Sequence, residues 1–440
     1  MVKITFLGAG STVFARNVLG DCMAAQSLSD AEIALYDIDG RRLSESLAIL
    51  EAINKTTNNG RARIKSYAGE ENRREALRGA DFIINAIQIG GYEPSTVIDF
   101  EIPKKYGLRQ TIADTLGIGG IMRALRTIPV MQTFANDIEE VCPEALFINY
   151  ANPMAMLTGY MQRYTEVKTV GLCHSVQQCA ENILTGIGLE DKLEGHTELI
   201  AGINHMAWLL DIRDRDGNDL YPEIRRRALA KNDNEKHNDM IRYEYIRNFG
   251  YYCTESSEHN AEYNPFYIKS RYPELIEKYN IPLDEYPRRC VEQIRAWEED
   301  RKTIAHDASR SHERSSEYAS YILESIVTNK PYKIGGNVLN TGLITNLPAE
   351  ACVEVPCLVD GNGITPCYVG RLPVQLAAMN TTNINVQLLT IEAAVTKKKE
   401  HIYQAAMLDP HTSAELSIDD IKNMCDDLIE AHGAYMDIYK

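Results

Sequence analysis

The sequence predicts an α/β fold in which a doubly wound parallel sheet is followed by a mixed α+β region. Three observations support this prediction. An apolar run over residues 3–7 ends in a glycine, as a buried parallel strand does. Apolar runs then alternate with helix-prone segments up to about residue 175, which is the pattern of βαβ units. Beyond that point the alternation stops.

The first region is expected to form a Rossmann-like sheet of the lactate and malate dehydrogenase type. We expect strands at residues 3–7, 32–38, 80–87, 145–150 and 170–172, and helices at 12–28 and 121–141. Because such sheets bind dinucleotides at the carboxyl ends of their strands, residues 1–175 are predicted to be an NAD-binding domain.

The second region is expected to be a mixed α+β domain over residues 176–440. Residues 223–250 and 284–330 are charged and helix-prone, 333–369 contain short β-like pieces with Gly and Pro, and 370–440 are mostly helical. We expect this domain to bind the substrate, carry catalytic groups and support oligomerisation, with the active cleft between the two regions. The boundary falls between about residues 170 and 200.

Composition excludes several classes of protein. The 440 residues carry a net charge of −16, and an acidic chain repels nucleic acid backbones. No apolar run approaches the roughly 20 residues needed to cross a membrane. The chain opens directly into a strand, so a cytoplasmic location is expected. The ten cysteines include no C-x-x-C pair, so disulfides are not expected.

A dinucleotide fingerprint follows the first strand. Gly8 and Gly10 allow a tight turn and a close backbone approach to a pyrophosphate, while Ser11 and Thr12 open a helix whose N-terminus favours phosphate. Asp37, at the end of the next strand, is expected to accept the ribose hydroxyls and to favour NAD over NADP. The alternative is a glycine turn that has lost its cofactor.

A metal site is predicted where two segments each place a soft or borderline ligand after an apolar run. Cys173 and His174 follow one run, and His205 follows residues 202–204. Cys173 and His205 can converge on one divalent cation and leave positions open for a substrate. Such a pair also suits Zn, Fe, Co or Ni. The alternative is a buried cysteine with two hydrogen-bonded histidines.

Several segments resemble the family 4 glycoside hydrolases, which are NAD- and Mn²⁺-dependent glycosidases. The resemblance rests on residues 8–12, 149–154, 173–176 and 202–205, and extends to 88–94, 113–117, 254–259 and 407–412. It covers nearly the whole chain and is strongest for the α-galactosidase branch. In this branch the metal-binding Cys is followed by His-Ser-Val, as in residues 173–176.

The resemblance implies a mechanism and roles for particular residues. NAD removes a hydride from C3 of the sugar, a base takes the C2 proton, the C1–O bond is eliminated, water adds, and the hydride returns. Cys173 and His205 would hold Mn²⁺, and His174 would be the acid. Tyr263, which opens an aromatic segment over 263–267, would be the base. Asn152 and Arg289 would contact the sugar. Homodimers or homotetramers are expected.

The expected substrate is an unphosphorylated α-galactoside such as melibiose. Members of the family that act on phosphosugars carry an Arg where this chain has Ser95, and a neutral hydroxyl cannot hold a phosphate as Arg does. The alternatives are an α-glucosidase or α-galacturonidase of the same family, an NAD-dependent dehydrogenase of the lactate/malate type, or a non-catalytic NAD sensor.

Overall fold

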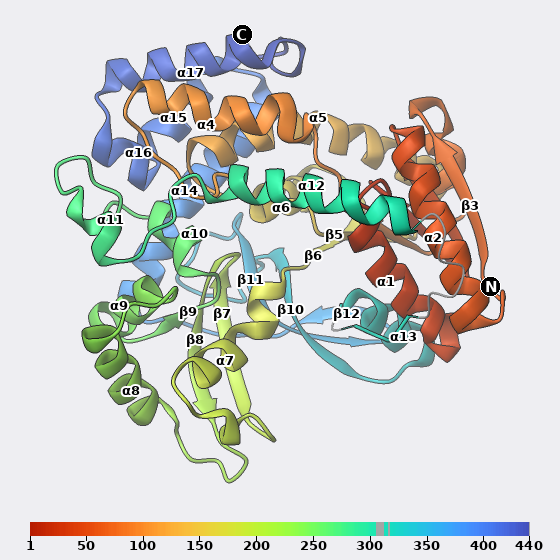
Figure 1. Ribbon diagram of the computed structural model, residues 1–440, viewed down its shortest axis with the longest axis horizontal. Coiled ribbons are helices and arrows are strands. Elements are labelled where there is room, and N and C mark those ends of the chain that lie inside the picture. The colour runs from red at the N-terminus through yellow and green to blue at the C-terminus, as the bar shows by residue number, and fades with distance from the viewer. Residues whose placement is uncertain (305–311, 316, 440) are drawn as a thin grey trace.

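A single sheet of twelve strands runs through the molecule (Figure 1). The computed structural model describes residues 1–304, 312–315 and 317–439. Six parallel strands form one half of the sheet, in the order β3 (Arg63–Ala68), β2 (Glu32–Asp37), β1 (Lys3–Leu7), β4 (Phe82–Asn85), β5 (Leu146–Asn149) and β6 (Lys168–Gly171). This is the strand order of a Rossmann fold, so the predicted doubly wound sheet is confirmed.

The parallel strands end in register at one edge. Leu7 pairs with Asn85, Asn85 with Asn149, and Asn149 with Gly171. The residues that follow these strands therefore meet at the carboxyl edge of the sheet, where doubly wound folds bind their ligands.

Most predicted elements of this half are present, with shifted ends. The helix expected at 12–28 is α1 (Thr12–Ala24), the strand expected at 80–87 is β4 alone, and the helix expected at 121–141 begins earlier, as α5 (Gly117–Val141). Strand β3 was not predicted. It lies at the edge of the sheet and most of its side chains are exposed, so it lacks the apolar run that marks a buried strand.

The second half of the sheet is antiparallel. It continues with β10 (Tyr332–Leu339), β11 (Cys352–Asp360), β7 (Thr197–Ile203), β8 (Met206–Arg213) and β9 (Tyr252–Cys253), and β12 (Gly363–Pro366) pairs with β11. Strand β10 joins the first half where Asn337 pairs with Gly171. The division of the chain near residue 175 stays a prediction, because the sheet itself is continuous there.

The remaining helices surround the sheet. They are α2 (Gly40–Asn58), α3 (Arg73–Leu77), α4 (Val97–Lys105), α6 (Met154–Tyr164), α7 (His174–Gly186), α8 (Tyr221–Asn234), α9 (Met240–Phe249), α10 (Ser257–Glu262), α11 (Glu274–Lys278), α12 (Glu285–Ile304), α13 (Ala319–Thr328), α14 (Val374–Thr396), α15 (Lys399–Leu408), α16 (Pro410–Glu415) and α17 (Ile418–His432). Within the helical region predicted at 284–330, residues 305–311 and 316 lie outside the described residues.

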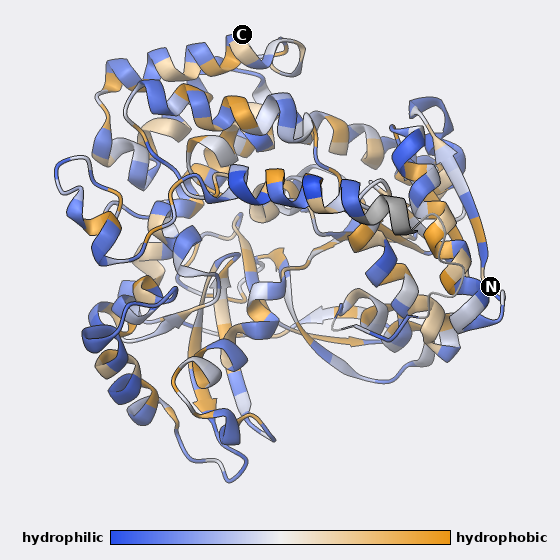
Figure 2. Ribbon diagram, in the orientation of Figure 1, coloured by the Kyte–Doolittle hydropathy of each residue, from blue (hydrophilic) through white to orange (hydrophobic). Residues whose placement is uncertain are grey.

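The C-terminal helices pack onto helices of the first half. Helix α14 contacts α5 and α6, and α17 contacts α4, and Figure 1 shows the blue C-terminal helices beside α4 and α5. One apolar core contains residues from both halves, such as Phe6, Phe147 and Trp208, all fully buried. In Figure 2 the central strands carry much orange, whereas α8 is mostly blue. No described helix is long and apolar enough to cross a membrane.

Candidate active site

A cavity of about 450 Å³ opens at the carboxyl edge of the parallel strands. One wall comes from the residues after β4, β5 and β6, and the facing wall comes from the second half of the chain and from α12. A cavity of this size accommodates a small ligand together with part of a cofactor. The structure brings five of the predicted site residues to its surface: Asn152, Cys173, His174, His205 and Arg289.

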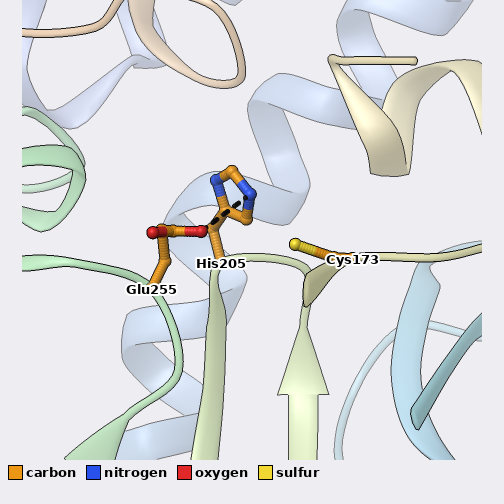
Figure 3. Close-up of side chains that lie close together, drawn as sticks. All are labelled: Cys173, His205 and Glu255. Carbon is orange, nitrogen blue, oxygen red and sulfur yellow. Dashed lines mark ion pairs between the residues drawn. The ribbon is translucent and has the colours of Figure 1, made fainter. Parts of the chain in front are cut away.

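Three side chains in this cavity form a group that can hold a metal ion. One ligand atom each from Cys173, His205 and Glu255 lies within 4.8 Å of the other two. Figure 3 shows the three side chains, with a dashed line for the ion pair between His205 and Glu255. A thiol, an imidazole and a carboxylate together suit a divalent transition metal. The predicted Cys173–His205 pair therefore does meet, and Glu255 is a third candidate ligand that the sequence analysis did not single out.

Each of these residues stands at the end of a strand. Cys173 follows β6, His205 lies in the turn between β7 and β8, and Glu255 follows β9. His205 has a φ of 65°, a left-handed conformation that is costly for a residue other than glycine and is often found at functional sites. Short connections from a rigid sheet thus fix all three ligand atoms.

The protonation states of the three side chains follow from their burial. Burial lowers the pKa of His205 to about 4, so its ring is neutral at pH 7 and has a free lone pair for a metal. Burial alone would raise the pKa of Glu255, but His205 and His259 lower it to about 2. Burial raises the pKa of the Cys173 thiol, and the carboxylate of Glu255 adds to this. The group therefore carries one negative charge and one exchangeable thiol proton.

Tyr263, the predicted base, lies behind His205. Its hydroxyl is 2.9 Å from His205 Nδ1, while His205 Nε2 is 3.3 Å from a Glu255 oxygen. The Tyr263 side chain is fully buried and is not among the described residues that line the cavity. Burial, then the charges of Asp114 and Glu262, raise its pKa well above 10. Without a cation nearby the phenol is therefore protonated, and its hydroxyl contacts the ring of His205.

His174, the predicted acid, is held by a carboxylate and by aromatic rings. Its Nε2 atom lies 2.7 Å from an oxygen of Glu317. The neighbouring Tyr318 donates its hydroxyl to the backbone carbonyl of Cys173 at 2.8 Å. The rings of Tyr150 and Tyr318 lie about 6 Å from the imidazole, at 5.9 and 6.1 Å between centroids. Glu317 was not predicted, since nothing in its surrounding sequence distinguishes it from other charged residues.

Asp114 lies in the cavity on a tightly held loop. The Glu262 carboxylate accepts backbone N–H groups from Thr111 and Ala113, each at 2.8 Å. Gly120 lets α5 approach this loop, because a Cβ there would lie 2.7 Å from the carbonyl carbon of Thr115. Asp114 itself accepts a hydrogen bond from the Asn152 side chain at 3.2 Å. The loop thus positions a carboxylate next to the predicted substrate residue Asn152.

The predicted nucleotide turn adjoins the cavity. Gly8 has a φ of 84°, and a Cβ there would lie 2.8 Å from the carbonyl oxygen of Ala86. A Cβ on Gly10 would lie 2.7 Å from Asp37 Oδ2, which accepts the Gly10 N–H at 2.7 Å. Only glycine fits these two positions, which leaves a bare backbone surface of the kind that a pyrophosphate requires.

The helix that follows this turn connects it with the cavity. Ser11 precedes α1 without capping it through its side chain, and the Thr12 hydroxyl binds the carbonyl oxygen of Gly10 at 3.3 Å. The first N–H groups of α1 therefore have no side-chain cap. Phe14, in the first turn of α1, lines the cavity.

Ser95 does not lie where the sequence interpretation places it. Its side chain is fully buried, its hydroxyl has no hydrogen-bond partner among the described residues, and it is not among the described residues that line the cavity. The loop packs this hydroxyl against Gly90 instead. Ser95 therefore does not itself face a substrate. Other residues, which line the cavity, must decide whether it accepts a charged sugar.

Comparison with known protein families identifies the chain. Residues 3–189 match the model of family 4 glycosyl hydrolases, and residues 200–412 match the model of the family 4 glycosyl hydrolase C-terminal domain. The chain belongs to this family. Family membership decides against the dehydrogenase and NAD-sensor interpretations and confirms the resemblance seen in the sequence.

Individual relatives extend the match over the full chain. An α-galactosidase of Bacillus subtilis is 62% identical over 440 residues, which cover 100% of both chains. An α-galactosidase of Rhizobium meliloti is 35% identical over 447 aligned residues, covering 99% of this chain and 89% of the relative. A Thermotoga maritima 6-phospho-β-glucosidase, solved with manganese, NAD⁺ and glucose-6-phosphate, has a TM-score of 0.78 at 20% identity and covers 99% of both chains. This last likeness concerns the fold.

Proposed function

We propose that this family 4 enzyme is an α-galactosidase that hydrolyses unphosphorylated α-galactosides and uses NAD and Mn²⁺. The observation that carries the proposal is the meeting of Cys173, His205 and Glu255 in a cavity that adjoins a glycine turn of the dinucleotide-binding type. The full-length relative at 62% identity is named an α-galactosidase, which supports the choice of sugar and anomer.

The residues present fit both cofactors. Gly8, Gly10 and Asp37 would hold NAD, with the pyrophosphate at the start of α1 near Ser11 and Thr12. Cys173, His205 and Glu255 would hold the cation. The choice of manganese follows from the family resemblance and from the manganese-bound structure of similar fold. When bound, NAD would accept and return a hydride at C3 of the sugar, and the cation would polarise the oxygen at C3.

The chain itself supplies the proton transfers. His174 is proposed to donate a proton to the leaving oxygen, since its ring reaches the cavity and Glu317 holds it at 2.7 Å. Tyr263 is proposed to accept the C2 proton. Burial, and then nearby carboxylates, raise its pKa, and positive charge at the metal group would counter the effect of the carboxylates. Asn152 and Arg289, which both line the cavity, are proposed to bind sugar hydroxyls.

One assay tests the proposal directly. Hydrolysis of 4-nitrophenyl α-galactoside is measured under reducing conditions with NAD⁺ and Mn²⁺ omitted in turn. Activity should require both, NAD⁺ should not be consumed, and hydrolysis in D₂O should place deuterium at C2 of the released galactose. The α-glucoside and the α-galacturonide are assayed in parallel as the alternative substrates. Full activity after exhaustive chelation, or galactose without deuterium, would refute the proposal.

The proposal includes a cytoplasmic location and a homodimer or homotetramer that interacts with neither nucleic acid nor membranes. The supporting features are the acidic net charge of −16 and the family resemblance. Cell fractionation tests the location. Light scattering coupled to size-exclusion chromatography tests the number of subunits.

A further inference from the structure

Arg289 reaches the cavity with its charge already compensated. Its Nη2 donates to Glu258 Oε1 at 2.5 Å, and its Nε donates to Glu285 Oε1 at 2.7 Å. Glu285 is also the partner of Arg288, at 2.6 Å. The carboxylates are more buried than the guanidinium, since the side chains of Glu258 and Glu285 are 16% and 7% exposed and that of Arg289 is 42% exposed. Of these two carboxylates, Glu285 is shared between Arg288 and Arg289, whereas Glu258 on α10 pairs with Arg289 and not with Arg288.

The other cation of the cavity is compensated as well. The described residues that line the cavity include two arginines, Arg123 and Arg289, and no lysine. Arg123 donates to the backbone oxygen of Asn152 at 3.2 Å, and its charge helps to keep the pKa of Asp114 below the ordinary value against the effect of burial. Both arginines of the cavity are therefore already held by protein groups before a sugar binds.

From this charge balance we propose that Glu258 is a specificity-determining residue that restricts the enzyme to uncharged sugars. By holding the Arg289 guanidinium, Glu258 leaves it able to donate to a hydroxyl but prevents it from acting as an uncompensated cation towards a carboxylate or phosphate on the substrate. The inference rests on the proposed function and deepens it, because it assigns the choice between galactosides and galacturonides to one ion pair. That choice cannot come from Ser95, which is buried away from the cavity.

The test is Glu258→Gln in the full-length enzyme loaded with NAD and Mn²⁺. Galactose and galacturonate differ only at C6, so calorimetry with each sugar measures selection by charge independently of turnover. The ratio of the two Kd values should shift towards galacturonate by about tenfold or more. The ratio of kcat/KM for 4-nitrophenyl α-galacturonide and 4-nitrophenyl α-galactoside should move in the same direction. The gain should weaken as salt is added, whereas galactose binding should not.

Matched variants distinguish this role from a structural one. Glu292→Gln removes the same charge on α12, where the carboxylate binds Arg288 at 2.7 Å, and should leave the ratio unchanged. Glu258→Gln combined with Arg289→Gln should lose the gain in galacturonate binding. If Glu258→Gln does not fold, Glu285→Gln should shift the ratio in the same direction. A ratio within about twofold of wild type, or equal weakening of both sugars, would overturn the inference. Wild-type protein that binds the sugars but hydrolyses no α-galactoside would refute the proposed function alone.

Discussion

The variant Glu255→Gln tests the composition of the metal group. The amide keeps the shape of the side chain and can still accept the Ser256 N–H, which Glu255 Oε1 accepts at 2.7 Å. At neutral pH the carboxylate is ionised while His205 is neutral, so Glu255 supplies the negative charge of the group before a cation binds. The substitution therefore removes one charge and one strong oxygen ligand.

The expected loss of affinity follows from the distances. The ligand atoms of the three side chains lie within 4.8 Å of one another, so a cation bound by all of them is about 2–3 Å from each. Two unit charges 4 Å apart interact by about 4 kcal/mol at an effective dielectric constant of 20, and a dication doubles this. The carboxylate gives up its pairing with His205 and its remaining hydration, which offsets much of the gain. We expect a net loss of at least about 2.8 kcal/mol, or about 100-fold in Kd.

The assay is calorimetric titration of Mn²⁺ into chelator-treated, reduced protein, with free Mn²⁺ checked by its electron paramagnetic resonance signal. Glu258→Gln is the control, because it removes the same charge from a carboxylate that already pairs with Arg289 at 2.5 Å. The control should bind Mn²⁺ within about threefold of wild type. If Glu255→Gln also bound Mn²⁺ within about threefold of wild type, Glu255 would not be a ligand of the cation.

Three further predictions concern the same cavity. Tyr263→Phe should slow deuterium entry at C2 by about 100-fold, while the Kd for Mn²⁺ changes less than about tenfold. If metal binding were instead greatly weakened and the rate of deuterium exchange at C2 were unchanged, Tyr263 would orient His205 and would not be the base. Metal affinity should rise about tenfold per pH unit between about pH 6 and 8, because burial raises the pKa of the Cys173 thiol and its proton must leave when the metal binds, whereas His205 is already neutral. Calorimetry in buffers of different ionisation enthalpy measures that proton, and finding none would contradict the argument. Glu317→Gln should lower kcat for alkyl α-galactosides about tenfold more than for 4-nitrophenyl α-galactoside. The reason is that an alkoxide leaving group needs the proton of His174 more than a nitrophenolate does. An equal loss of kcat on both substrates would indicate a structural role for Glu317.

The predictable part of the fold is the part whose strands are buried on both faces. Strands β1 and β2 are apolar runs because helices cover both sides of a parallel sheet, so the sequence marks them. Strand β3 includes Arg63 and Lys65 and faces solvent at the edge, so its sequence resembles that of a loop. The joining of β10 to β6 was not predictable either, because pairing between strands so far apart in the chain leaves no local pattern.

The sequence by itself determined the glycine turn with Asp37 and the presence of a thiol and an imidazole after apolar strands. These features are local. The conformational freedom of a glycine, the end of an apolar strand and the ligand chemistry of a side chain each depend on one residue and its neighbours in the chain. Only the tertiary structure decided that Glu255 joins Cys173 and His205, that Glu317 holds His174, and that Glu258 compensates Arg289. The physical reason is that a charged side chain acquires its function from the partner it meets and from its loss of water, and both are set by packing between distant segments.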